Sequence, residues 1–115
     1  MPNARQALGA AGEARAARWY EAHGYVVLAR NWRAPARGGE LDLVVARAGW
    51  LVFVEVKTRR TARFGVPAEA VTPEKQRRIH GLAAQYVRAT GARGRWRFDV
   101  ASILAGELTV LEAAF

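Results

Sequence analysis

The chain has 115 residues, and 18 Lys and Arg against 10 Asp and Glu give it a net charge of +8. A chain of this length is expected to form one domain, over residues 1–115, with a single modest core. It has no cysteine, which excludes disulfides and thiolate-ligated zinc. Its longest uncharged apolar run, Ala48 to Val54, is far below the roughly 20 residues of a membrane span, and the N-terminus lacks the apolar stretch of a signal peptide. We therefore expect a soluble, cytoplasmic protein without membrane contact.

The positive charge is concentrated in the middle of the chain. Residues 57–97 carry a net charge of +9, whereas residues 1–56 carry +2 and residues 98–115 carry −3. Most of these cations are arginines, which hold phosphates in bidentate geometry and stack on bases. Nucleic acid is the anionic partner that this pattern favours, although an arginine-rich composition can also reflect a GC-rich coding sequence.

Hydropathy and capping signals predict two helices and four or five strands. In chain order we expect a helix over Ala4 to His23 ended by Gly24, strands over Tyr25 to Ala29, Leu41 to Ala46 and Leu51 to Val56, a helix over Thr72 to Thr90 ended by Gly91, a strand over Arg95 to Leu104, and an extra strand over Leu108 to Leu111. The order α-β-β-β-α-β predicts an α/β fold with a mixed central sheet flanked by helices.

The predicted hairpin brings four charged side chains together. If its turn is Ala48-Gly49, opposed positions add to 97, so that Asp42 faces Glu55 and Glu40 faces Lys57 on one face of the sheet. The other face then carries only apolar residues, namely Leu41, Leu43, Val45, Val52, Val54 and Val56. Directly opposed carboxylates repel each other. A Mg²⁺ ion would neutralise them, with Lys57 orienting a metal-bound water; a structural ladder of salt bridges is the alternative.

A longer series of motifs surrounds this cluster. It comprises Gly12-Glu13-Ala14, Gly24-Tyr25, Gly39-Glu40-Leu41-Asp42-Leu43, Phe53-Val54-Glu55-Val56-Lys57-Thr58-Arg59, Lys75-Gln76-Arg77-Arg78-Ile79 and Arg97-Phe98-Asp99-Val100. Asp42 with Glu55-Val56-Lys57 resembles the PD-(D/E)xK signature of nucleases with the restriction-endonuclease-like fold. The whole series is similar to the YraN-like family of small bacterial proteins, which is related to archaeal Holliday-junction resolvases. The proline of the nominal signature is replaced by Leu41.

The resemblance implies a role for several of these residues. Asp42 and Glu55 would bind Mg²⁺ or Mn²⁺, Lys57 would position the attacking water, and Glu13 on the first helix would be a further metal ligand. Gln76 is expected to be an active-site polar residue, and Glu40 an accessory one. For Glu13 the residues alone leave a second reading open, because an acid early in a helix also suits the helix dipole.

Basic side chains that follow the cluster are expected to hold the DNA backbone. They are Arg59, Arg60, Arg63, Lys75, Arg77 and Arg78. Trp32 and Trp96 stand among arginines and could stack on unpaired bases. Packing in the core or at its rim is the interpretation that we favour for both tryptophans, because tryptophan is largely buried on average.

These expectations lead to a metal-dependent endonuclease that acts on DNA. The resemblance suggests branched or junction DNA, and a two-fold junction favours a homodimer. One alternative is a nucleic-acid-binding module that keeps the fold without cleavage. Another is an adaptor whose basic surface binds an acidic partner.

Overall fold

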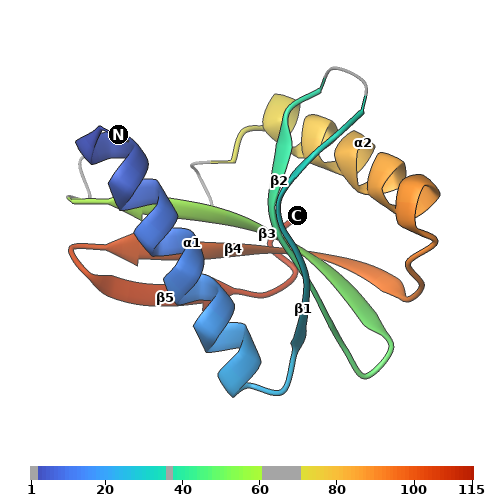
Figure 1. Ribbon diagram of the computed structural model, residues 1–115, viewed down its shortest axis with the longest axis horizontal. Helices are drawn as coiled ribbons and strands as arrows, with labels where there is room; N and C mark the ends of the chain where they lie inside the picture. Colours follow the sequence, from blue (N-terminus) through green and yellow to red (C-terminus); the bar gives the residue numbers. More distant parts are fainter. Residues whose placement is uncertain (1–2, 36–37, 61–70) are drawn as a thin grey trace.

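The computed structural model describes residues 3–35, 38–60 and 71–115. Their order along the chain is α1 (Ala4–Ala22), β1 (Val26–Arg33), β2 (Glu40–Arg47), β3 (Trp50–Arg59), α2 (Pro73–Thr90), β4 (Arg95–Leu104) and β5 (Glu107–Leu111). The predicted α/β fold with an extra last strand is thereby confirmed (Figure 1). Strands β1 and β3 both continue a few residues beyond their expected ends at Ala29 and Val56. No described helix is long and apolar enough to cross a membrane.

The five strands form one mixed sheet in the order β1-β2-β3-β4-β5. Neighbouring strands are antiparallel except β3 and β4, which run parallel from Trp50↔Arg95 to Arg59↔Leu104. Parallel neighbours need a crossover connection, and the segment containing α2 provides it. The carboxyl end of β3, with Glu55 and Lys57, therefore leads towards the start of α2.

The two helices cover opposite faces of this sheet. On one face α1 packs Ala16, Ala17 and Tyr20 against Leu43, Val45, Val52 and Val54. On the other face α2 packs Ile79, Leu82, Ala83 and Tyr86 against Val44, Leu51, Phe53 and Phe98. Figure 1 shows α1 crossing in front of β3, β4 and β5, with α2 lying apart from it beside β2. Alternate side chains of the central strands thus serve two cores, which explains why β2 and β3 are apolar on both faces.

The hairpin of β2 and β3 has the predicted register near its turn. Arg47 lies opposite Trp50, and Val44 lies opposite Phe53. The two turn residues, Ala48 and Gly49, have φ values of 49° and 82°. Two positive φ values match the twist of a two-residue hairpin, so the opposed positions add to 97 as expected.

The expected pairing is wrong beyond Leu43, where the ladder with β3 ends at the pair Leu43↔Val54. Leu41 was expected to share a face with Leu43, but it packs into the core on the α2 side. The change of face occurs at Asp42, beside Asn31 of β1, whose φ is 48°. A positive φ at a non-glycine residue disturbs regular strand geometry. The strands β2 and β3 separate where the acidic residues begin.

Candidate active site

Asp42 lies in the fork where β2 and β3 separate. Its Oδ2 accepts a hydrogen bond from the main-chain N–H of Val56 at 2.9 Å. If the β2–β3 ladder continued, the N–H of Val56 would donate to a main-chain carbonyl of β2. The Asp42 carboxylate takes the place of that carbonyl as the acceptor. Burial, followed by the negative charge of Glu55, raises the pKa of Asp42 to about 7, against the lowering effect of the Val56 hydrogen bond. Asp42 and Glu55 therefore lie close together without facing each other in a ladder pair.

Glu55 is a buried carboxylate with two lysine partners. Its Oε1 lies 2.8 Å from Nζ of Lys75 and 3.5 Å from Nζ of Lys57. Glu55 is 8 % exposed, whereas the side chains of Lys75 and Lys57 are 22 % and 26 % exposed. A buried carboxylate that lost both partners would remain charged in a poorly solvated position. The two lysine ammonium groups thus compensate the negative charge of Glu55.

The two lysines respond to this arrangement in opposite directions. Burial, and then the neighbouring Lys75 ammonium, lowers the pKa of Lys57 against the effect of Glu55. Burial also opposes the charge of Lys75, but its hydrogen bonds to Glu55 and Lys57 outweigh burial and raise its pKa. Lys75 is therefore the cation that holds Glu55. Lys57 is the amine that gives up its proton more readily.

Lys75 reaches the site because of how α2 begins. Thr72 is the N-cap, its hydroxyl accepts a hydrogen bond from the Lys75 N–H at 3.2 Å, and Pro73 occupies the first helical position. These signals confirm the helix start that the sequence predicts. They also fix Lys75 in the first turn, at the end of the helix nearest Glu55. Lys75 was expected among the backbone-binding cations, and the sequence offered no signal that it pairs with Glu55.

Glu13 approaches the site from the other face of the sheet. Its negative charge contributes to the raised pKa of Asp42. Glu13 lies in the middle of α1, and the first turn of that helix contains no acidic residue. The helix-dipole reading of Glu13 is therefore wrong. The role of Glu13 as a metal ligand, which the family resemblance implies, stays a prediction.

The approach of α1 to the site depends on Gly12. A Cβ at Gly12 would overlap the hydroxyl of Thr58 and would lie 3.3 Å from Cδ1 of Ile103. The Thr58 Oγ1 is itself buried, and the described residues offer it no hydrogen-bond partner. The absent side chain thus lets the helix touch β3 directly after Lys57, which brings Glu13 alongside.

The two remaining polar candidates have other partners. The Gln76 amide nitrogen donates to the carbonyl of Val71 at 3.0 Å and so holds the chain that enters α2. Glu40 lies opposite Arg33 of β1 and forms an ion pair with it at 2.5 Å. The expected facing pair of Glu40 and Lys57 is therefore absent from the β2–β3 ladder. Glu40 stands at the rim, where its partner is an exposed arginine.

The predicted backbone-binding cations divide into three groups. Arg60, Arg77 and Arg78 are exposed, and Arg59 is half-buried. Arg78 lines a pocket of about 370 Å³ at the start of α2, together with Thr72, Glu74 and Lys75. Arg63 lies outside the described residues. The pocket places a guanidinium next to the lysine that holds Glu55.

The oxygen atoms of the site fit a hard divalent cation with few protein ligands. Across residues 3–35, 38–60 and 71–115, no three Asp, Glu or His side chains converge closely enough to hold a metal ion by themselves. Asp42 and Glu55 supply two neighbouring carboxylates whose mutual repulsion is visible in the raised pKa of Asp42. Mg²⁺ is commonly bound through one or two carboxylates and retains several waters. The donor set is consistent with Mg²⁺ or Mn²⁺ in that form.

Comparison with known proteins places the chain in a family. The profile of a family described as "Uncharacterised protein family UPF0102" matches residues 12–103. A UPF0102 protein of Rhodococcus jostii (strain RHA1) is 54% identical over 101 residues, which cover 87% of this chain and 84% of the relative. UPF0102 proteins of Beutenbergia cavernae and Symbiobacterium thermophilum are 50% and 49% identical, over 88% and 86% of this chain and 85% and 83% of the relatives. The chain therefore belongs to the UPF0102 family, the YraN-like family that its motifs resemble.

Proposed function

We propose that this protein is a metal-dependent endonuclease that hydrolyses DNA phosphodiesters, with branched DNA as its preferred substrate. The observation that carries the proposal is the proximity of Asp42 and Glu55 in the fork between β2 and β3. Two carboxylates held close together in a partly buried place repel each other unless a bound cation neutralises them. Clusters of carboxylates and lysines with displaced pKa values are typical of catalytic sites.

Each residue then has a distinct role. Asp42 and Glu55 would hold Mg²⁺ or Mn²⁺, with Glu13 adding negative charge from α1. The bound ion would neutralise phosphate charge and make its water more acidic. Lys57, whose pKa is lowered by burial, is suited to orient a water and to exchange a proton with it. Lys75 lies within reach of the same carboxylate and would stabilise charge on the phosphate.

The charge distribution supports DNA as the substrate. The acidic pair lies just before the segment 57–97, which carries a net charge of +9. Exposed Arg77 and Arg78 on the first turns of α2 can hold phosphates that flank the cut. The resemblance to junction resolvases favours branched DNA, and a two-fold junction would be met by two copies of the chain.

One observation favours a second candidate, a DNA-binding module without cleavage. Lys75 already neutralises Glu55 at 2.8 Å, which would satisfy the carboxylate without any metal. In that case the fold and the basic surface would be retained for binding alone.

A cleavage assay on the purified protein separates the two functions. Duplex, flap, single-stranded and four-way DNA would be incubated with Mg²⁺, with Mn²⁺ or with a chelator. We expect cleavage that requires metal, is strongest on a branched substrate, and falls at least about 100-fold in Asp42→Asn and Lys57→Ala. Glu107→Gln, an exposed carboxylate on β5, is the matched control and should cleave normally. DNA binding without cleavage under every metal condition would establish the binding module instead.

A further inference from the structure

One edge of the sheet is left partly uncovered. Strand β5 pairs with β4 only from Val100↔Leu111 to Leu104↔Glu107, so the first half of β4 extends beyond it. The N–H of Ala114 covers part of this edge by donating to the carbonyl of Phe98 at 2.7 Å. Main-chain groups alternate in direction along a strand, so the N–H and C=O of Trp96 point to the same edge as those of Phe98. Trp96 therefore presents both a donor and an acceptor where β5 does not reach.

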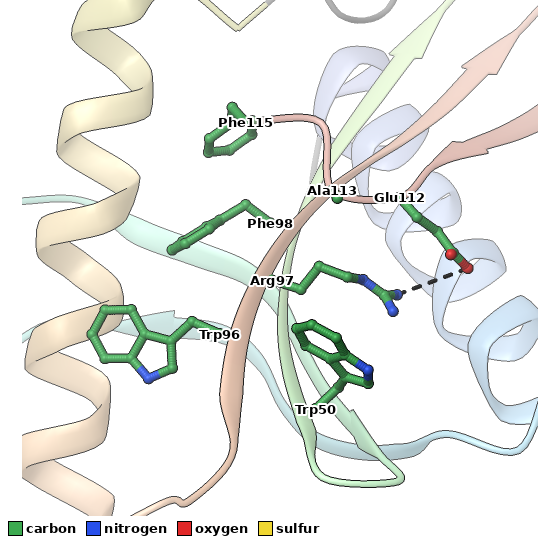
Figure 2. Close-up of a pocket in the computed structure, with 7 residues that line it drawn as sticks. All are labelled: Trp50, Trp96, Arg97, Phe98, Glu112, Ala113 and Phe115. Carbon is green, nitrogen blue, oxygen red and sulfur yellow. Dashed lines mark ion pairs between the residues drawn. The ribbon is translucent and has the colours of Figure 1, made fainter.

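A pocket of about 430 Å³ lies at this edge, which we call the edge pocket. It is lined by Trp50, Trp96, Arg97, Phe98, Glu112, Ala113 and Phe115. Figure 2 shows the rings of Trp96, Phe98 and Phe115 on the α2 side of β4, with Trp50, Arg97 and Glu112 on the other side. The volume falls within the range of small-ligand sites. The edge pocket is therefore bordered by apolar rings on one side of β4 and by charged groups on the other.

Trp96 has an aromatic surface available for stacking. It is 42 % exposed and so packs at the rim of the core, whereas Trp32 is half-buried against Tyr86. Trp96 meets Phe53 and Phe98 at interplanar angles of 72° and 78°, which are edge contacts. Within the described residues no ring stacks face to face on it. A planar ligand can therefore use this ring.

The surroundings of the edge pocket are suited to a nucleotide. The guanidinium of Arg95 lies 4.4 Å from the ring centre of Trp50, and both Arg95 and Arg93 are exposed. Arg97 is held by Asp99 through hydrogen bonds of 2.9 and 2.7 Å, and it lies 3.9 Å from Glu112. Glu112 is 56 % exposed and lies on the side of β4 opposite to Trp96. The rim is thus positively charged for phosphate, and the interior is aromatic for the base.

We propose that the edge pocket binds one unpaired base of single-stranded or branched DNA, with Trp96 stacking on the base and Arg95 holding its phosphate. The identity of DNA as the ligand rests on the proposed function. Trp96 lies opposite Leu51, which is four residues before Glu55 on β3, or about 13 Å of strand. A stacked strand with the duplex rise of about 3.4 Å per nucleotide covers this distance with about four nucleotides, and an extended strand covers it with fewer. The bound base lies about that far from the phosphate that is cut.

The test uses forked DNA with 2-aminopurine at successive positions of its unpaired arm, and blunt duplex for comparison. Wild-type protein should quench 2-aminopurine most strongly within about four nucleotides of the cut. Trp96→Leu, which keeps apolar volume but removes the ring, should weaken forked-DNA binding by about 5- to 100-fold and leave blunt-duplex binding unchanged. Trp19→Leu is the matched control, because Trp19 stacks on His23 of α1, away from the edge pocket. Arg95→Gln is a second variant on an exposed side chain, and it should weaken forked-DNA binding in the same direction.

The outcomes separate this proposal from the proposed function. If Trp96→Leu and Arg95→Gln bind forked DNA as tightly as wild type while metal-dependent cleavage persists, the edge pocket is not a base site and the nuclease proposal stands. An equal loss on forked and blunt DNA also overturns the base site, because unpaired bases would then not be distinguished. If the wild-type protein binds no form of DNA, both proposals fall.

Discussion

The Lys75 ammonium lies closer to Glu55 than the Lys57 ammonium does, at 2.8 Å against 3.5 Å, although Lys57 is only two residues away along β3. The nearer cation comes from the first turn of α2, which lies within the crossover that links β3 to β4. The acidic site is therefore assembled by packing as well as by the hairpin. Several measurable consequences depend on this contact and on those around it.

Replacing Lys75 should change how the site competes for metal. Lys75→Gln removes an ion pair that a metal ion must displace, and it removes a like charge beside the ion. An exposed or half-buried ion pair contributes about 0.2–1 kcal/mol, so Mn²⁺ affinity in the absence of DNA should rise about two- to fivefold. Isothermal titration calorimetry measures the Mn²⁺ affinity. Arg77→Gln, on the exposed face of α2, is the control variant. Equal affinities in the two variants would mean that Lys75 and the metal do not compete.

The stability of the metal-free protein should depend on pH through Asp42. Its pKa is raised from 3.8 to about 7 on folding, chiefly by burial and Glu55, so the folded state holds the proton more tightly than the unfolded state. Stability from this group is complete below about pH 4 and is lost as the pH rises through 7. Asp42→Asn removes the charge. Its free energy of unfolding should therefore be about 1–4 kcal/mol higher than that of wild type at pH 8, and the two values should be nearly equal at pH 4.

Denaturant unfolding at the two pH values, in chelator, measures this difference. A constant difference between Asp42→Asn and wild type at pH 4 and pH 8 would show that Asp42 is not the group responsible. Glu107→Gln on β5 is the control, and it should change stability by less than about 0.5 kcal/mol.

Two glycines of α1 should respond oppositely to the same substitution. Gly12→Ala forces a methyl group into the Thr58 hydroxyl, which should lower stability by about 1–3 kcal/mol. Gly9→Ala has open space around it, and the better helix propensity of alanine should raise stability by up to about 1 kcal/mol. Thermal unfolding compares them, and Thr58→Ala should recover part of the loss in Gly12→Ala. A stabilised Gly12→Ala would contradict the close approach of α1 to β3.

The buried carboxylate of Asp99 should be a strong determinant of stability. It is fully buried, and it accepts hydrogen bonds from Tyr20 at 2.7 Å, from Arg97 and from the N–H of Ala113 at 3.0 Å. Asp99→Ala would leave the half-buried Arg97 cation without its main partner, at a loss of about 3–5 kcal/mol. Tyr20→Phe should lose only about 1–2 kcal/mol. Urea unfolding measures the stability of both variants. An equal loss of stability in Asp99→Ala and Tyr20→Phe would contradict the inference that the Asp99 carboxylate is the main partner in this network.

Local signals in the sequence predicted most of the secondary structure. Thr72-Pro73 fixes the start of α2, and Gly91 ends it with a φ of 71°, because each residue satisfies a local backbone requirement. Strand β4 has its expected bounds, and the Ala48-Gly49 turn has its expected register. The predicted hairpin also indicated that Asp42, Glu55 and Lys57 lie near one end of β2 and β3, although the ladder itself ends at Leu43↔Val54.

The failures lie where distant segments decide the geometry. Strand alternation predicted that Asp42 faces Glu55. Instead, β2 separates from β3 on the N-terminal side of Leu43, and the Asp42 carboxylate accepts a hydrogen bond from the main-chain N–H of Val56. Periodicity cannot reveal such a fork, because it depends on how β1 and α2 pack against Leu41. Whether Trp96 lies in the core or at its rim could not be predicted for a similar reason, since its exposure depends on where β5 ends.

By itself the sequence determined the elements, their order and the concentration of positive charge after Lys57, because these follow from residue types and short-range periodicity. Only the tertiary structure decided that Lys75 holds Glu55, that the charge of Glu13 acts on Asp42, and that an aromatic pocket remains open at the edge of β4. Those contacts join residues far apart along the chain. Their distances depend on how helices and strands pack around the two cores, which is a property of the whole fold.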